Sequence, residues 1–209
     1  SNIRHNRKEE FIKAIESEMN DLGMSSTKFD VEIMSDEDEE GILIVDGVNI
    51  KANAYGIDNI EFIIAPNKQS IFQPLRKIAS GGEISRIMLS LKNVLSLGDY
   101  CETMVFDEID VGVSGRIAEV IGEKIAALSK RKQILSVTHL AQIAIYSNTH
   151  FKVIKNEGED NVTSTIEELN ENTRVGEIAR MITGKEITEA SIKHAAELLE
   201  GARKSNIFI

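Results

Sequence analysis

Residues 103–137 hold a short apolar segment, a helix-like segment and a second short apolar segment, and this order strongly constrains the fold. Thr103-Met104-Val105-Phe106 and Gln133-Ile134-Leu135-Ser136-Val137 have the length and composition of buried strands. Between them, apolar residues recur at helical intervals, at Ile117, Val120, Ile121, Ile125 and Leu128. Strands that are joined through a helix pair in parallel. The sequence therefore predicts an α/β protein with a mostly parallel sheet and flanking helices.

Polar residues follow both predicted strands at their carboxyl ends. Asp107 and Glu108 come directly after the first strand, and Thr138 and His139 come directly after the second. Open α/β sheets bind ligands at the carboxyl edge of their strands, so these side chains are expected to lie close together. Two plainer interpretations stay open at this point. The acid pair also fits a solvated turn, and the histidine also fits a hydrogen-bonded side chain at a sheet edge.

The segment Ser80-Gly81-Gly82-Glu83 predicts the start of a helix. Ser80 and Glu83 have the spacing of a capping box, and apolar residues then follow at helical intervals at Ile84, Ile87, Met88, Leu91 and Leu95. The first turn of such a helix offers unpaired backbone N–H groups and the positive end of the helix dipole. The two glycines leave room for a ligand to approach the backbone. The segment is therefore a candidate phosphate site, although alone it also fits a capped helix after a turn.

The first 76 residues are expected to form a helix and a small antiparallel sheet. One face of a charged helix would carry Phe11, Ile12, Ile15, Met19 and Leu22. From residue 28 the apolar residues alternate with polar ones, and further strands are predicted at 42–45 and 61–64. The acidic run 36–40 is expected to be a solvated loop rather than a contact surface. Residues 65–76 hold both prolines and would link this region to the Ser80 helix.

The remainder of the chain predicts helices and one hairpin. Residues 140–146 are expected to be helical, 151–155 and 162–167 to form an edge hairpin, and 174–182 and 188–204 to form two closing helices. Ser114 is expected to cap the helix that lies between the two buried strands.

Composition excludes several classes of protein. No apolar run reaches the length of a membrane span. The single cysteine, Cys101, excludes an internal disulfide, and four scattered histidines argue against a zinc site, so a reducing cytoplasm is expected. A net charge of −10 argues against a segment that grips DNA alone, because nucleic-acid-binding domains usually carry a basic patch. The chain begins Ser-Asn, which suggests a piece of a longer protein.

Taken together, the motifs resemble those of the ABC-type ATPase family. Ser80-Gly81-Gly82-Glu83 is similar to its signature, residues 103–108 to its Walker B motif, residues 109–115 to its D-loop, and Thr138-His139 to its H-loop. Over residues 77–89 and 106–115 the amino-acid sequence is most similar to the RecN-like branch of this family, whose members are SMC-like ATPases of double-strand-break repair and recombination. The resemblance covers most of the chain from about Phe29 onward.

The resemblance implies roles in ATP hydrolysis for the residues of the Walker B motif and the H-loop. Asp107 would hold Mg²⁺, which prefers oxygen ligands, and Glu108 would act as the general base for the attacking water. His139 would hydrogen-bond the γ-phosphate of ATP.

Two further motifs would act between protomers. The signature would bind ATP that is held by a second copy of the protein, through Ser80, Gly81, Gly82 and Glu83. The D-loop would couple two facing sites and contains Asp110, Ser114 and Gly115.

The sequence lacks one motif that an ATPase needs. A phosphate-binding loop of the form G-x-x-x-x-G-K-S/T does not occur, and Gly184-Lys185 is followed by glutamate. A helix N-terminus contributes about 0.3–2 kcal/mol toward binding an anion, whereas micromolar affinity needs about 8 kcal/mol. This chain alone is therefore expected to be inactive.

The resemblance also implies how the missing motif is supplied. In ABC-type heads a Walker A lobe comes earlier in the chain, and two heads bind ATP between them. Residues 1–27 would then be the end of a coiled-coil arm, and residues 28–209 the C-terminal half of a head, with a β-rich entry segment at 28–76 and the motifs at 77–209. The implied partners are the N-terminal Walker A lobe, a second copy, and DNA in the full-length protein, which would be cytoplasmic and nucleoid-associated.

Three alternatives stay open from the sequence. A transporter nucleotide-binding domain usually has glutamine after S-G-G, whereas this chain has Glu83. Another SMC-like head would fit the motifs nearly as well. A non-catalytic interaction module with an ATPase-like fold would have no chemical need for Glu108.

Overall fold

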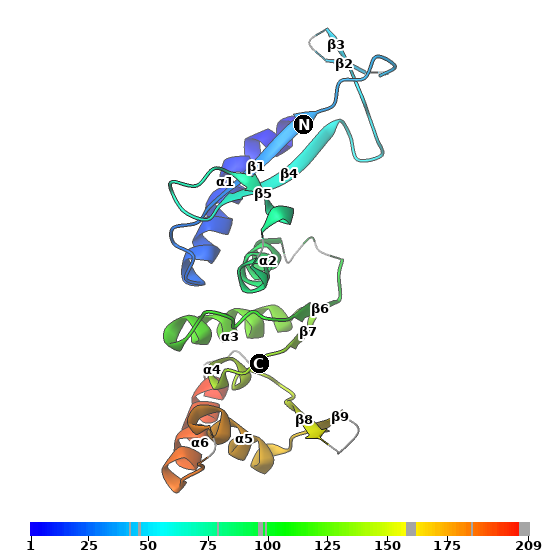
Figure 1. Ribbon diagram of the computed structural model, residues 1–209. Coiled ribbons are helices and arrows are strands. Elements are labelled where there is room, and N and C mark those ends of the chain that lie inside the picture. The colour runs from blue at the N-terminus through cyan, green and yellow to red at the C-terminus, as the bar shows by residue number, and fades with distance from the viewer. Residues whose placement is uncertain are drawn as a thin grey trace. The chain divides into compact units, whose positions relative to one another are not determined.

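The computed structural model describes residues 1–41, 43–45, 47–78, 80–95, 98, 100–157, 162–184 and 186–204 (Figure 1). Ile42, Ala79 and Lys185, which belong to segments discussed above, lie outside these residues. The chain divides into two compact units, Ser1–Gly98 and Asp99–Ile209. Among the helices described, none has both the length and the apolar composition that crossing a membrane requires.

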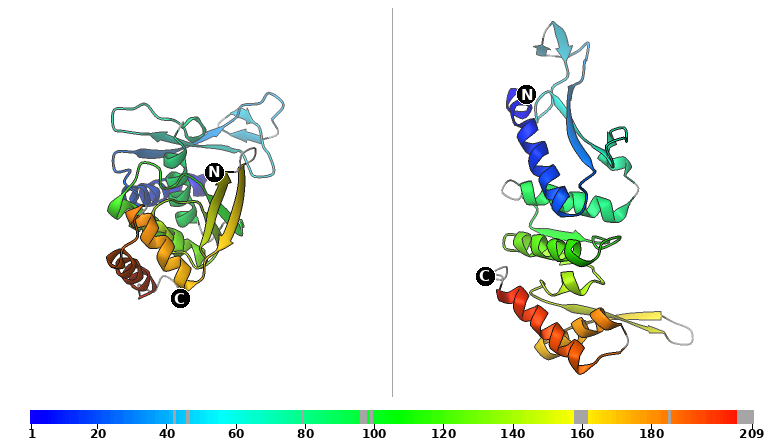
Figure 2. Two further views of the ribbon diagram at one scale, coloured as in Figure 1. Left: turned by 60° about the horizontal axis from the view of Figure 1, so that its bottom comes forward. Right: turned by 90° about the vertical axis from the view of Figure 1, so that its left-hand side faces the viewer.

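The first unit is an antiparallel sheet that packs against helices. Strand β1 (Lys28–Ser35) pairs along its whole length with β4 (Asp58–Ala65), and β4 pairs with the short β5 (Gln73–Pro74). Helix α1 (Asn2–Asp21) packs on β1 and on α2 (Gly81–Leu95), as Figure 2 shows. A short 3₁₀ helix, η1 (Leu75–Lys77), leads from β5 toward α2.

The core of this unit follows from the apolar periodicity of its elements. Side chains that are fully or almost fully buried come from α1, β1, β4 and α2: Ile15, Met19, Phe29, Ile63, Ile64, Ile87, Leu89 and Leu91. Phe11, Phe29 and Phe62 add an aromatic cluster with ring centroids 5.5–6.1 Å apart. The predicted N-terminal helix and small antiparallel sheet are therefore confirmed.

A second hairpin lies in the insertion between β1 and β4. Strand β2 (Leu43–Val45) pairs with β3 (Val48–Ile50). The acidic run lies beside β3. The backbone N–H of Asp38 donates to the carbonyl of Asn49 at 3.0 Å, and the backbone N–H of Lys51 donates to the backbone carbonyl of Asp36 at 2.9 Å. Most of the acidic side chains are exposed, as predicted for a solvated segment.

The second unit contains the predicted strand–helix–strand segment. Strands β6 (Thr103–Phe106) and β7 (Gln133–Ser136) pair in parallel, with Thr103 opposite Gln133 and Phe106 opposite Ser136. Helix α3 (Gly115–Ser129) connects them and packs on β7 and on the short α4 (Ala141–Ala144).

The rest of this unit is a hairpin followed by two helices. Strands β8 (Phe151–Glu157) and β9 (Val162–Glu168) pair antiparallel, and α5 (Glu171–Thr183) then packs on α6 (Glu189–Lys204). A buried cluster joins α3, α4, α5 and α6 through Ala126, Ala141, Ala144, Ile145, Tyr146, Ile178, Ala179, Ala195, Leu199 and Ala202.

The α/β class is confirmed, but the proportion of parallel pairing is lower than the sequence suggested. Within the described strands, only β6 and β7 pair in parallel, and the other pairs are antiparallel. A parallel pair needs a crossover connection, and the described residues contain one strand–helix–strand unit of that kind. The prediction of a mostly parallel sheet therefore holds only for the β6–β7 pair.

Candidate functional site

The acid pair lies at the carboxyl end of β6 and is exposed. The backbone N–H of Glu108 donates to Oδ1 of Asp107 at 2.9 Å. Glu108 has a φ of 57°, and no other non-glycine residue in the described part of the chain has a positive φ. This left-handed conformation is disfavoured for residues with a side chain and often occurs at functional positions. The local backbone thus holds Glu108 in a costly conformation directly after the strand.

A tight turn leads from the acid pair into α3. The backbone N–H of Val111 donates to the carbonyl of Glu108 at 3.1 Å. Gly112 and Gly115 have φ of 73° and 54°, which residues with a side chain rarely adopt. Ser114 occupies the N-cap position of α3 but makes no side-chain capping bond, so the prediction of a serine cap is wrong. The positive φ of Gly115 departs from a regular first helical turn, whose N–H groups a serine N-cap would otherwise bind.

Asp110 joins this turn to the segment that follows β7. Its Oδ2 accepts hydrogen bonds from the hydroxyl of Thr138 at 2.6 Å and from the backbone N–H of His139 at 2.8 Å. Nδ1 of His139 lies 2.8 Å from the same oxygen. The β6–β7 pairing places the two segments side by side, because Val137 N–H donates to the carbonyl of Phe106 at 2.9 Å. The two strand ends that carry the acid pair and the histidine therefore lie side by side in the second unit.

The burial of these side chains differs sharply. Asp110 is 4% exposed, whereas the side chain of His139 is 72% exposed. The buried carboxylate of Asp110 therefore contacts Nδ1 of the imidazole, while most of the histidine side chain is exposed to solvent.

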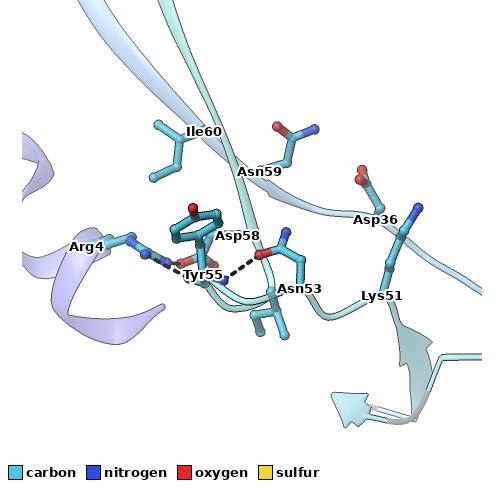
Figure 3. A pocket seen from close by; sticks show the side chains of 9 residues that line it. Arg4, Asp36, Lys51, Asn53, Tyr55, Asp58, Asn59 and Ile60 are labelled. Carbon is cyan, nitrogen blue, oxygen red and sulfur yellow. Dashed lines mark hydrogen bonds and ion pairs between the residues drawn. The ribbon is translucent and has the colours of Figure 1, made fainter.

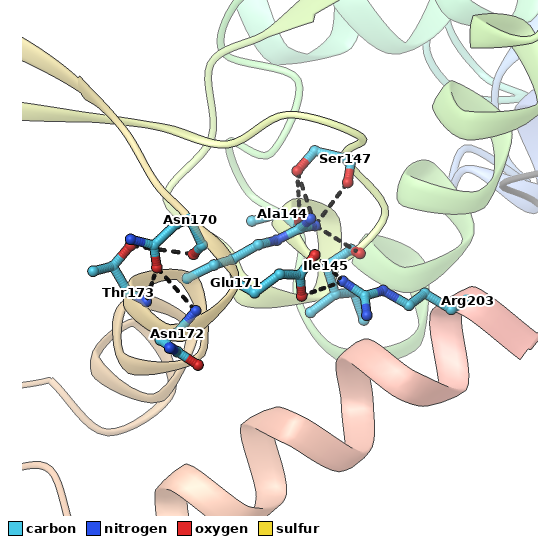
Figure 4. A network of polar contacts seen from close by, with 9 residues as sticks. Ala144, Ile145, Ser147, Asn170, Glu171, Asn172, Thr173 and Arg203 are labelled. Carbon is cyan, nitrogen blue, oxygen red and sulfur yellow. Dashed lines mark hydrogen bonds and ion pairs between the residues drawn. The ribbon is translucent and has the colours of Figure 1, made fainter.

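A buried arginine binds backbone carbonyls in the segment that follows His139. Arg174 on α5 donates through one Nη atom to the carbonyls of Ala144, Ile145 and Ser147 at 3.3, 3.2 and 2.7 Å (Figure 4). These carbonyls lie at the C-terminal end of α4 and in the residues directly after it, where backbone carbonyls lack partners within the helix. Burial lowers the pKa of Arg174 from its ordinary value.

No pattern in the sequence singles out Arg174. The available signal was an arginine on the inner face of an otherwise amphipathic helix, next to the buried Ile178. Such a position requires polar partners, but the sequence does not say where they lie.

The Ser80–Glu83 segment belongs to the first unit. The N–H of Glu83 lies 3.4 Å from the Oγ of Ser80, and the N–H of Ile84 donates to the Ser80 carbonyl at 3.0 Å. Helix α2 begins at Gly81, as predicted. Gly81 is exposed and Gly82 is buried. The helix start at this motif is therefore present, with a long hydrogen bond from the serine cap.

The described residues offer few ligands for a metal. No group of three or more His, Cys, Asp or Glu side chains among them is arranged to hold a metal ion. The exposed carboxylate of Asp107 suits Mg²⁺ in a site where phosphate and water supply the other oxygens, which is how magnesium commonly binds. The donor set thus fits a nucleotide-bound magnesium rather than a metal held by protein alone.

One cavity of about 390 Å³ lies in the first unit, beside the start of α1 (Figure 3). Its wall includes Arg4, which donates to Oδ2 of Asp58 at 2.5 Å and to the carbonyl of Tyr55 at 3.2 Å. The charge of Asp58 is therefore already compensated. None of the candidate site residues lines this cavity.

Comparison with known proteins gives relatives but no family model that matches the chain. The chain is 42% identical over 203 residues to the DNA repair protein RecN of Treponema pallidum. This alignment covers 96% of this chain and 34% of the relative. It is 36% identical over 204 residues to the DNA repair protein RecN of Bacillus subtilis, which covers 97% of this chain and 35% of the relative. The chain thus spans about a third of the length of these curated relatives.

A solved structure supports the fold. The Smc head domain with a coiled coil and joint from Pyrococcus yayanosii aligns with a TM-score of 0.50 at 14% identity. The alignment covers 92% of this chain and 29% of that one. At this identity the likeness concerns the fold alone.

Proposed function

We propose that this chain is the C-terminal part of an ATPase head that acts in double-strand-break repair. Nearly its whole length aligns with RecN DNA repair proteins, and the aligned part is about a third of the length of each of them. The relatives bear the RecN name and the fold resembles an Smc head, so a transporter domain is not favoured. The same relationship disfavours a non-catalytic interaction module.

The observation that carries this proposal is the junction of the acid-pair turn with the histidine segment through Asp110. It places two exposed carboxylates and one exposed imidazole at the carboxyl edge of a parallel strand pair, where α/β sheets bind ligands. A carboxylate that can hold a metal, a base for the attacking water and a hydrogen-bond donor for the phosphate are the groups that phosphoryl transfer to water requires.

Each group then has a role in hydrolysis. Asp107 would hold Mg²⁺, and Glu108 would accept a proton from the attacking water. His139 would donate a hydrogen bond to the γ-phosphate. Bound Mg²⁺·ATP supplies the electrophilic phosphorus and a cation that offsets the charge on the phosphate oxygens. Residues of the D-loop, Ser114 and Gly115 among them, lie exposed where a facing protomer could reach them.

A missing partner layer is supported by the face of the β6–β7 pair that points away from the core. Val105, Leu135 and Val137 are 67%, 50% and 61% exposed, and Val105 lies opposite Leu135 on the same face. Parallel sheets normally have both faces covered. We assign this face to the N-terminal Walker A lobe of the same protein.

The remaining partners follow from this assignment. The Ser80–Glu83 segment would cap ATP that is bound by the Walker A lobe of a second copy, which makes the active form a homodimer around ATP. DNA would bind to the assembled protein at the nucleoid, since this chain carries a net charge of −10. Residues 1–27 would be the end of the coiled-coil arm and residues 28–209 the C-terminal half of the head.

ATP turnover by the full-length parent protein tests the proposal. Glu108→Gln is expected to lower turnover by about 10²- to 10⁴-fold, because it removes the general base, while ATP binding persists. Glu102→Gln is the matched control, since Glu102 is exposed in the same unit and lies outside the turn. Equal turnover in the two variants would contradict the catalytic assignment.

A further inference from the structure

We propose that Asp110 is a positioning residue for His139, which determines the ring nitrogen that the histidine offers to a ligand. The catalytic consequence of this inference rests on the function proposed above. Its structural basis lies entirely within the second unit.

The geometry around Asp110 is that of a buried anchor. One carboxylate oxygen lies within 2.8 Å of three groups, namely the Thr138 hydroxyl, the His139 backbone N–H and the His139 Nδ1. Hydrogen bonds to an ionised carboxylate are shorter and stronger than those between neutral groups. Because Asp110 is almost fully buried, these bonds are also poorly accessible to competing water.

Thr138 fixes the direction of this network. A hydroxyl has one proton to donate, and Thr138 donates it to Asp110. Its oxygen then accepts the N–H of Leu140 at 3.0 Å, directly before α4 begins. The backbone around His139 is therefore held by two hydrogen bonds. The N–H of His139 donates to Asp110, and the N–H of Leu140 donates to the hydroxyl oxygen of Thr138.

The network has a defined consequence for the imidazole. The 2.8 Å contact between Nδ1 and Oδ2 of Asp110 favours a neutral ring with its proton on Nδ1, because a carboxylate accepts hydrogen bonds and does not donate them. Nε2 is then the nitrogen left for a ligand, on a side chain that is 72% exposed. In the protonated ring, Nδ1 stays bound to Asp110 and Nε2–H becomes the donor toward a phosphate oxygen.

This assignment also refines the expected role of the D-loop. Asp110 is 4% exposed, which limits its access to a facing protomer, whereas Gly112 and Ser114 of the same turn are exposed. We therefore assign coupling to a second site to these exposed residues.

The tautomer of His139 in this chain, without nucleotide, is the first test. Long-range ¹H–¹⁵N spectra recorded at alkaline pH distinguish a neutral ring with its proton on Nδ1 from one with its proton on Nε2. His139→Gln identifies the resonances among the four histidines. The unmodified chain is expected to show Nδ1–H. A proton on Nε2 would overturn the proposal without any further variant.

Two alanine variants then separate positioning from general stability. Asp110→Ala is expected to lose the Nδ1–H preference, whereas Asp58→Ala, which removes a carboxylate in the first unit whose side chain is 3% exposed, is expected to keep it. Retention of Nδ1–H in a folded Asp110→Ala chain would also contradict the proposal.

ATP turnover in the full-length parent protein is the second test. Asp110→Ala is expected to lower turnover by about 10- to 100-fold, as losses of orienting partners usually do, and Asp58→Ala to leave it close to the parent value. If Glu108→Gln abolishes turnover while Asp110→Ala matches Asp58→Ala, the positioning role is wrong and the ATPase assignment stands. If the parent protein hydrolyses no ATP, the proposed function fails, and the tautomer result still decides the structural claim.

Discussion

The ammonium group of Lys152 on β8 lies 2.6 Å from a carboxylate oxygen of Glu177 on α5, and Glu177 is 7% exposed. Arg180 donates to the same carboxylate from one turn further along α5. Hydrogen bonding from Arg180, with a smaller contribution from Lys152, lowers the pKa of Glu177 from 4.5 to about 2. A single buried carboxylate thus ties the hairpin to the C-terminal helices.

This ion pair predicts a specific dependence of stability on acid. A carboxylate whose pKa is lower in the folded state stabilises that state above its unfolded pKa, here near 4.5, and this contribution is lost as the pH falls toward 2. Glu177→Gln is therefore expected to lower the free energy of unfolding at pH 7, and its difference from the unmodified chain should shrink between pH 4.5 and pH 2. Urea unfolding at several pH values measures both effects.

Glu197→Gln is the control for this series, because Glu197 forms an exposed ion pair rather than a buried one. Its Oε1 lies 4.0 Å from Nζ of Lys193 on the same helix. It is expected to change the unfolding free energy by less than about 0.5 kcal/mol. A difference between Glu177→Gln and the unmodified chain that stays constant from pH 7 to pH 2 would refute the assignment.

The backbone conformation at Glu108 predicts that a glycine variant is more stable than an alanine variant, the reverse of the usual order in a helix. At a φ of 57°, Glu108→Gly is expected to be more stable than Glu108→Ala by about 1 kcal/mol, because alanine retains the steric cost of the left-handed conformation. At the exposed helical position Glu119 in α3 the order should reverse, with glycine less stable by about 1 kcal/mol. Chemical denaturation of the four variants measures both differences. The same order at both positions would show that Glu108 is not held with a positive φ.

Gly122 predicts a tight contact between α3 and α4. A Cβ at this position would lie 3.0 Å from the carbonyl of Gln142 and even closer to the ring of Tyr146. Gly122→Ala is therefore expected to destabilise the chain by about 1–3 kcal/mol, although alanine favours helix formation. Gly176→Ala in α5, where a Cβ meets nothing within 4 Å, is expected to be neutral or to stabilise by up to about 1 kcal/mol. Melting temperatures of the two variants decide the matter, and a stabilised Gly122→Ala would contradict the packing.

The parts of the site that the sequence predicted are those that depend on local patterns. The strands β6 and β7 are short apolar runs, and each is followed at once by its polar residues, so the position of Asp107 and His139 at the strand ends required only the parallel pairing. Helix α2 begins at Gly81 because the serine and the glycines mark a helix start in the sequence itself.

The parts that the sequence did not predict depend on contacts between distant residues or on backbone conformation. Arg174 contacts carbonyls about 30 positions earlier in the chain, and no periodicity encodes such a pairing. The positive φ of Glu108 and the unused hydroxyl of Ser114 follow from the conformation of one turn, which the residue types alone do not determine. The open face of β6–β7 was not anticipated, because an apolar strand gives the same signal whether its partner layer is in this chain or elsewhere.

The arginine beneath α4 sets an order for the maturation of this region. Four residues are too few to hold a helix by themselves, so α4 depends on packing and on the guanidinium that binds its terminal carbonyls. During synthesis, the segment that carries His139 leaves the ribosome well before Arg174 does. Residues 144–147, which follow His139, therefore acquire their final support only after α5 has been made and has folded against the rest of its unit.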